Sequence, residues 1–297
     1  MIVYIFNYEL KSSNMNQFEK FQSAISITKI KDNFYKIIPN RDYFVGNTPH
    51  GGYLNAVMSK ALLSTLPHKN IISSSTQYLD RTDSVDTFLE VELLKASRGS
   101  SAGLVKLIQG NKICSTMTGT CSDFEKMKGF HGLESRLPDI FNSHDHNKYK
   151  ELNYDKISKG FTPSFIKQLD CKINPDHAWW DKDPLDNNAD ARCSAFLEMS
   201  GGMADQFCLA YYSDILPPVV SNKYGALGWI PTLTLTTHIR MMPTTSKLFA
   251  DFKASDINNG YFEQDARIWD LNGNFVASSR QLARILKSEE KLSIKRK

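Results

Sequence analysis

Two similar segments of the chain differ at one position, where only one of them carries a carboxylate. One segment begins at Gly51-Gly52 and the other at Gly201-Gly202, and each continues through an apolar stretch to a Leu-Pro pair. Near the end of that stretch the first segment has Ser64 and the second has Asp214. A carboxylate within hydrogen-bonding distance of a water can accept its proton, which a lone serine does poorly. The difference indicates a duplicated unit in which the second copy keeps the chemistry.

The elements around these segments repeat in the same order. Apolar residues recur every three or four positions over 51–65, which predicts a helix that Pro67 stops, and a second helix is predicted over 201–216. Strand-like runs are predicted at 71–80, 86–97, 102–109 and 112–124, and again at 165–173, 191–199, 229–242, 246–256, 261–270 and 274–286. This order predicts an α+β protein of two repeats, each an antiparallel sheet wrapped around a central helix.

Composition changes along the chain divide it into five parts. The predicted parts are an N-terminal extension at 1–24, a first repeat at 25–124, a linker at 125–162, a second repeat at 163–286 and a basic tail at 287–297. A second methionine at Met15 leaves open whether residues 1–14 are a genuine start.

Composition is that of an ordinary soluble protein of 297 residues, with 41% hydrophobic and 23% charged residues. The net charge of +4 is mild, and the sequence has no basic-aromatic stripe, so a nucleic-acid partner is not expected. We expect no metal, because the sequence lacks paired cysteine or histidine ligands, and no membrane span. Five widely spaced cysteines favour reduced thiols in an intracellular protein, cytoplasmic or organellar, and the C-terminus is not the peroxisomal Ser-Lys-Leu.

Three stretches resemble the acyl-CoA thioesterase superfamily in its double-hotdog form, which is related to type II acyl-CoA thioesterases. They are Asn47 to Leu54, Trp229 to Leu233 and, most specifically, Ile268 to Gln281, with its pattern Trp-Asp-x-x-Gly-x-x-Val-Ala-x-x-x-Gln. The resemblance covers roughly 25–286 and is weakest over 125–190. It implies two hotdog repeats paired side by side around two central helices.

The resemblance also implies a catalytic set in the second repeat. By position, Asp214 matches the family's aspartate at the end of the helix, Gln281 its glutamine and Thr232 its threonine, and together these hold the attacking water. Thr234 and Thr236 lie on the same strand, and simple alternation places them on the same face as Thr232, so the register decides among the three. The first repeat should be catalytically empty, because alignment places Ser64, Ile72 and Gly119 opposite these positions.

Five further residues are expected to bind substrate: His50, Gly51, Gly52, Gly201 and Gly202. Unpaired N–H groups at a helix start can stabilise an oxyanion, and glycines let a thioester approach that backbone. The sequence leaves open which Gly-Gly pair serves Asp214, and whether His50 lines the acyl-CoA entrance or is a loop histidine bonded to backbone. For Trp179-Trp180, packing is the simpler interpretation and covering an acyl tunnel the other.

The predicted function is hydrolysis of acyl-CoA to a free fatty acid and CoA, with no cofactor because CoA enters as part of the substrate. Two alternatives stay open: a hotdog enoyl-CoA hydratase or dehydratase, which would need a His-Asp or His-Glu pair, and a non-catalytic acyl-CoA-binding protein. His238 is the only histidine on the strand after the second helix. Oligomers of double-hotdog units are possible.

Overall fold

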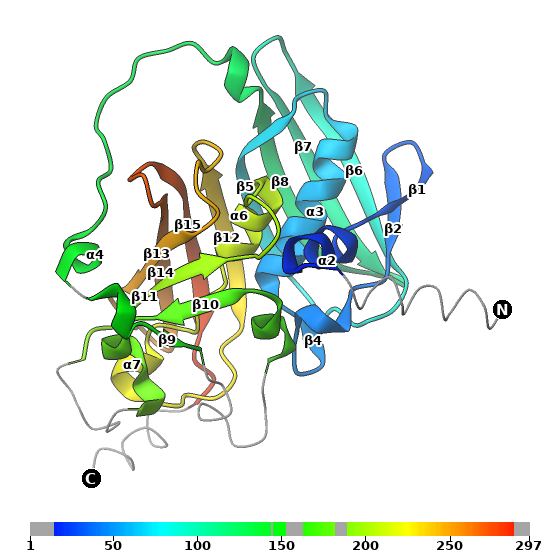
Figure 1. The fold of residues 1–297 in the computed structure, drawn as a ribbon. Helices are drawn as coiled ribbons and strands as arrows, with labels where there is room; N and C mark the ends of the chain where they lie inside the picture. The colour runs from blue at the N-terminus through cyan, green and yellow to red at the C-terminus, as the bar shows by residue number, and fades with distance from the viewer. Residues whose placement is uncertain (1–14, 144, 153–162, 182–188, 288–297) are drawn as a thin grey trace.

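The computed structural model describes residues 15–143, 145–152, 163–181 and 189–287. Their strands form one antiparallel sheet of 13 strands, ordered β1-β2-β6-β7-β8-β5-β12-β15-β14-β13-β11-β10-β9, with a separate short pair, β3 and β4. The two halves of the large sheet have the same internal order and meet at the β5–β12 pair. This is the α+β double hotdog that the sequence predicts (Figure 1).

The first half contributes six strands to this sheet, and the bounds of the four that follow the helix α3 (Gly51–Thr65) lie close to the predicted ones. They are β1 (Thr28–Lys31), β2 (Phe34–Ile37), β5 (Asn70–Tyr78), β6 (Thr87–Ala96), β7 (Ser101–Gln109) and β8 (Lys112–Ser122); β3 (Phe44–Val45) and β4 (Thr48–Pro49) form the separate pair. Alternation was a reliable guide here because one face of the sheet is buried, as the every-other-residue burial of β7 shows.

The second half contributes seven strands: β9 (Lys150–Glu151), β10 (Asp170–Ile173), β11 (Arg192–Glu198), β12 (Thr232–Ile239), β13 (Leu248–Ala254), β14 (Tyr261–Asp270) and β15 (Phe275–Arg284). The strand predicted from 165 is only half right, because Ser164–Gln168 forms the 3-10 helix η4 before β10 begins.

Two helices pack against each other at the centre of the sheet's covered face: α3 (Gly51–Thr65) and α6 (Gln206–Tyr212) (Figure 1). Ten residues of α3 are buried, so the helix is enclosed on most sides. The polar side chain of Asn55 joins the two repeats there. Its Nδ2 donates to the Ala210 carbonyl of α6 and to the Thr237 hydroxyl of β12, each at 3.3 Å.

The predicted helix over 201–216 is wrong at its start. Gly201 has a φ of +90°, which a helix cannot use, and the chain enters the helix only after Asp205. Asp205 is the N-cap: its carboxylate accepts from the N–H groups of Phe207 and Cys208, both at 2.9 Å. Asp214 lies in the turn that follows the helix.

Short elements also form in the two parts predicted as an extension and a linker. Helix α2 (Gln17–Ala24) has a capping box at Asn16 and buries Phe21 completely in the core shared by both repeats. Strand β9 pairs with β10 and extends the sheet. In Figure 1 the chain after β8 runs as a long green segment to α4 (Asp139–Ser143). The five-part division stays a prediction, and most of the predicted tail lies outside the described residues.

No helix in the described part of the chain is long and apolar enough to cross a membrane. All five cysteines are buried free thiols.

Candidate active site

The carboxylate of Asp214 lies at the junction of the two repeats. The residue follows α6 of the second repeat, and its side chain reaches the start of α3 in the first, where Oδ2 accepts from the Gly52 N–H at 3.0 Å. Asp214 is 9% exposed. The site is therefore composite, with an acid from one repeat held by backbone of the other, and the helix start beside Asp214 is that of Gly51-Gly52.

The first two residues of α3 must be glycines because atoms at the end of α6 and in the following turn lie very close to both of them. A Cβ on Gly51 would lie 2.7 Å from Asp214 Oδ2 and 3.3 Å from the Tyr78 ring. A Cβ on Gly52 would lie 2.5 Å from the Tyr211 carbonyl oxygen and 3.1 Å from Asp214 Cβ. The two glycines thus let the helix start approach the acid and the end of α6 directly.

Burial raises the pKa of Asp214 to about 7, because the charged form loses its hydration there, and the Gly52 N–H opposes this effect by stabilising the carboxylate. A carboxyl group that titrates near neutral pH is both ionised enough to take a proton and basic enough to hold it. Neighbouring Tyr78 stays protonated, since burial and then the Asp214 charge raise its pKa.

His50 is buried beside this carboxylate. Its ring stacks on Phe165 with 4.1 Å between centroids, and its Nε2 lies 2.9 Å from the Asp214 carbonyl oxygen and 3.5 Å from Oδ2. Burial lowers the pKa of His50 to about 4, so the ring is neutral and the 3.5 Å contact is not an ion pair. Because a carbonyl only accepts, Nε2 carries the proton. His50 is thus buried and bonded to backbone, the contact that the loop-histidine interpretation predicts.

Thr232 and Gln281 share the covered face of the β12–β15 pair. Thr232 stands opposite Ala283, and Gln281 stands opposite Leu235. A bulge at Leu233 reverses the alternation between Thr232 and the threonines that follow, so Thr234 and Thr236 turn to the other face. The prediction that simple alternation keeps all three threonines on one face is wrong, and the bulge separates Thr232 from the other two.

Gln281 is 5% exposed, and its Oε1 is buried with no partner among the described residues. The same face of β15 is tied to the turn that carries Asp214, since the Ser279 hydroxyl donates to the Ser213 carbonyl at 2.7 Å. From β12, the Thr237 hydroxyl donates to the Ser213 hydroxyl at 3.0 Å. The two strands therefore fix the position of the residue before Asp214.

Gly201 and Gly202 lie at another place in the molecule. A Cβ on Gly201 would meet the Asn16 side chain, and one on Gly202 would meet the Phe18 ring, so these glycines let α2 pack closely. The expectation that they form a helix start for substrate is wrong, because the helix begins later, at Gln206.

The first repeat holds apolar packing where the second has Thr232 and Gln281. Strand β5 has a bulge at Ile72, as β12 has at Leu233, and Ile71 therefore corresponds to Thr232; the aligned residue was predicted one position too late. A Cβ on Gly119 would overlap Leu62 of α3, so the helix occupies the space that a Gln281 side chain would need. The Ser64 hydroxyl donates within its own helix, to the Lys60 carbonyl at 2.8 Å, and the Ser64 carbonyl accepts from the Tyr35 hydroxyl at 3.0 Å.

Sequence reasoning missed Tyr78 and Asn55. The Tyr78 hydroxyl donates to the Gly51 carbonyl at 2.7 Å and holds the start of α3 from β5. Asn55 is a fully buried amide in a largely apolar helix, and that polar residue within an apolar pattern was the available signal. No group of three or more His, Cys, Asp or Glu side chains suited to a metal ion occurs in the described residues.

Two antiparallel half-sheets, each covering a helix and joined edge to edge with a buried acid at their junction, define a double-hotdog protein with one composite carboxylate site. Two family models match the chain: the acyl-CoA thioesterase N-terminal domain over residues 40–122 and the acyl-CoA thioesterase C-terminal domain over residues 144–285. Together they cover most of the sequence, one for each repeat. The chain belongs to the acyl-CoA thioesterase family, and it is a thioesterase.

Solved structures of low identity share the fold. A protein from Thermobifida fusca described as a candidate thioesterase II has a TM-score of 0.77 at 22% identity, covering 92% of this chain and 99% of its own. A hot dog fold protein from Alicyclobacillus acidocaldarius has 0.76 at 16%, covering 91% and 98%. Acyl-CoA thioesterase II TesB2 from Mycobacterium marinum has 0.70 at 14%, covering 91% and 98%. No curated protein matches the sequence.

Proposed function

We propose that the protein hydrolyses acyl-CoA to a fatty acid and CoA with Asp214 as general base. The observation that carries the proposal is a buried carboxylate whose pKa is raised to about 7 and which a helix N-terminus holds in place. Asp214 takes a proton from a water, and the water oxygen attacks the thioester carbonyl carbon. The C–S bond then breaks, and the proton on Asp214 passes to the departing thiolate of CoA.

The remaining groups orient the water and stabilise developing charge. Thr232 and Gln281 each offer a donor and an acceptor on the face that also anchors the Asp214 turn. The start of α3 presents the positive end of the helix dipole to the carbonyl oxygen as it becomes negative. As Asp214 gains the proton, it accepts more weakly from the Gly52 N–H, which then becomes available to that oxygen.

The test is thiol release from acyl-CoA by Asp214→Asn against Asp265→Asn. Asp265 is an exposed residue on β14, paired with Arg280, so the control makes the same chemical change away from the junction. We expect Asp214→Asn to lose hydrolysis and to keep the fold and acyl-CoA binding, and Asp265→Asn to match wild type. Wild-type turnover by Asp214→Asn would refute the assignment of the base, and tight binding without thiol release by the wild type would favour a binding protein.

One observation favours the hydratase or dehydratase alternative. His50 and Asp214 form the type of pair that such enzymes need, with Nε2 3.5 Å from Oδ2, whereas His238 is exposed on the other face of β12. Incubation with an enoyl-CoA separates the two reactions, because hydration removes the alkene absorbance and releases no thiol. We expect thiol release, since the His50 Nε2 proton is already committed to the Asp214 carbonyl.

A further inference from the structure

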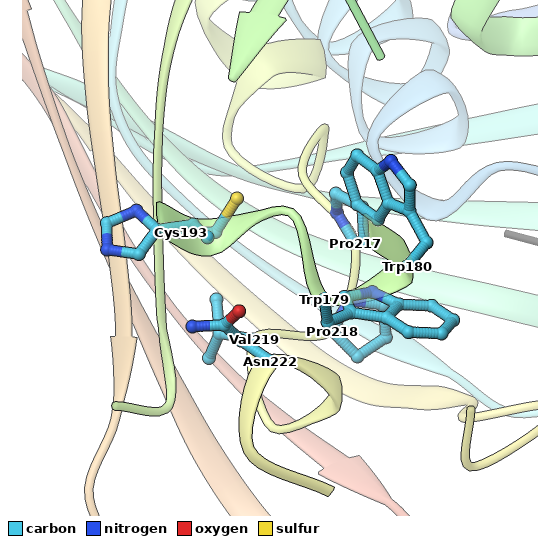
Figure 2. A pocket seen from close by; sticks show the side chains of 8 residues that line it. Trp179, Trp180, Cys193, Pro217, Pro218, Val219 and Asn222 are labelled. Carbon is cyan, nitrogen blue, oxygen red and sulfur yellow. The ribbon is translucent and has the colours of Figure 1, made fainter. Parts of the chain in front are cut away.

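The turn that carries Asp214 is closely packed where the chain leaves it. Pro217 and Pro218 share a small space with Trp179 and Trp180, and this space has no room for a water molecule (Figure 2). The structure therefore shows packing for the two tryptophans, which is the simpler of the two interpretations of their sequence. The groups that approach the Asp214 carboxylate lie elsewhere, at the start of α3.

The N–H group that holds Asp214 belongs to the same peptide group as a carbonyl that Tyr78 binds. The Tyr78 hydroxyl donates to the Gly51 carbonyl at 2.7 Å, and the Gly52 N–H donates to Asp214 Oδ2 at 3.0 Å. The Gly51 carbonyl and the Gly52 N–H are the two polar ends of one planar, conjugated amide. A continuous chain of hydrogen bonds therefore runs from the phenol to the carboxylate.

Such a chain makes the Gly52 N–H a stronger donor than it would be alone. A donor on the amide oxygen draws electron density from the nitrogen, which increases the partial positive charge on the N–H proton. Each bond in a chain of this kind is strengthened by about 10–30% in condensed phases. Burial, and then the charge of Asp214, raise the pKa of Tyr78, so the phenol keeps its proton over the pH range in which Asp214 titrates.

The sheet fixes Tyr78 at the junction of the two repeats. Tyr78 is the last residue of β5, the strand of the first repeat that pairs with β12 of the second. The next residue, Leu79, donates its N–H to the Cys114 carbonyl at 2.9 Å. A Cβ on Gly51 would lie 3.3 Å from the Tyr78 hydroxyl oxygen and 2.7 Å from Asp214 Oδ2. The phenol and the carboxylate therefore approach the same point of the helix start.

We propose that Tyr78 is a positioning residue that strengthens the Gly52 N–H as a donor, first to the Asp214 carboxylate and then to the oxyanion of the reacting thioester. The proposal deepens the proposed function and rests on it for the reaction. Before attack, the stronger donor lowers the pKa of Asp214 against the rise that burial causes. During attack, Asp214 takes the proton, and the same N–H becomes available to the carbonyl oxygen as it becomes negative.

The experiment is Tyr78→Phe, which removes the hydroxyl and keeps the ring. We expect the rising limb of kcat/KM for thiol release to move to higher pH, and kcat above that limb to fall. One oxyanion donor contributes about a hundred- to a thousandfold, so a loss of about 10–30% of that effect on a logarithmic scale lowers kcat about two- to eightfold. NMR titration of the Asp214 carboxyl carbon, assigned by its absence in Asp214→Asn, gives the ionisation midpoint without turnover.

Tyr35→Phe is the matched control, because it removes the same kind of bond from the other end of the same helix. The Tyr35 hydroxyl donates to the Ser64 carbonyl of α3 at 3.0 Å. We expect Tyr35→Phe to lower Tm about as much as Tyr78→Phe does and to keep the wild-type midpoint and kcat.

A ring-fluorinated tyrosine in place of Tyr78 makes the opposite change, because its more acidic hydroxyl is a stronger donor. The ionisation midpoint of Asp214 should then move to lower pH, a reversal that a purely structural bond would not produce. This substitution retains the hydroxyl, so the test stands even if Tyr78→Phe does not fold.

An Asp214 carboxyl midpoint that is the same in wild type, folded Tyr78→Phe and the fluorinated protein would overturn the proposal, and hydrolysis by Asp214 would stand if thiol is still released. A fall in kcat of more than about a hundredfold with an unchanged midpoint would also overturn it, because Tyr78 would then donate directly to the substrate. Conversely, a midpoint that moves in a protein that releases no thiol would keep the link between Tyr78 and Asp214 and reject the proposed hydrolysis.

Discussion

Adding one methyl group at Gly51 should disturb the proposed base without unfolding the protein. In Gly51→Ala the new Cβ would lie 2.7 Å from Asp214 Oδ2, which is closer than van der Waals contact allows. The atom that must move is the end of a side chain, so the carboxylate shifts and the helix can stay. The shift breaks the hydrogen bond from the Gly52 N–H, which is the interaction that lowers the pKa of Asp214.

The size of the effect follows from that bond. A hydrogen bond to a charged group contributes about 1.5–3 kcal/mol, which corresponds to about one to two pKa units. Loss of an interaction that favours the carboxylate raises the pKa of Asp214 above its native value of about 7. At pH 7 the ionised fraction of Asp214 then falls from about a half to a tenth or less. The activity at pH 7 should fall at least about fivefold and recover at higher pH.

The assay is kcat/KM for thiol release as a function of pH. Gly99→Ala is the control, because a Cβ there has no atom within 4 Å, and it should keep the wild-type midpoint. Gly52→Ala is a contrasting variant: its Cβ would lie 2.5 Å from a backbone oxygen of α6, so it should lower Tm as well as activity. If the rising limb of the pH profile keeps its midpoint near pH 7 in folded Gly51→Ala, the link between the helix start and the base is refuted.

Three further variants test the site and its surroundings. Asp214→Asn should be more stable than wild type at pH 8, by a free energy of unfolding on the order of 4 kcal/mol. The raised pKa means that the folded protein disfavours the ionised carboxylate, so wild type loses this stability as the pH rises from about 4 to 7 and the asparagine variant does not. Urea unfolding of both proteins at about pH 4 and pH 8 measures the difference. Gln281→Leu should lower kcat about tenfold or more without lowering Tm, since the amide Oε1 is buried and unpartnered, and a normal kcat would remove Gln281 from the site. Gly119→Ala should cost about 1–3 kcal/mol in unfolding free energy through its overlap with Leu62, with kcat unchanged in the folded protein, and an unaltered Tm would contradict that packing.

Periodicity predicted most of the fold because burial is one-sided. Helix α3 occupies the predicted 51–65, and the strands that follow it in each repeat lie within a few residues of their predicted positions. The second helix was misjudged because Gly201-Gly202 matches the first helix start in sequence alone. The positive φ of Gly201 and the contacts of both glycines with α2 are features of the tertiary structure, which the sequence pattern does not show. The nearby Asp205, which caps α6, was the true signal of the helix start.

The details of the site depended on features that a periodic pattern does not contain. A bulge changes the face of every residue beyond it, so the position of Thr232 relative to Thr234 could not be read from alternation. The contact between Gly52 and Asp214 joins two repeats. Only the docking of α3 against α6 determines which helix start meets which acid.

The way each helix is capped supports the proposal of a single site, beside Asp214. His50, the N-cap of α3, makes no side-chain cap bond, which leaves the Gly52 N–H free to hold Asp214 of the other repeat. At the corresponding start of α6, Asp205 already accepts from the first free N–H groups, and it places a negative charge there. A carboxylate at Ser64 would therefore find neither a free donor nor a positive helix end. The first repeat would need a new helix start, as well as new side chains, to become catalytic.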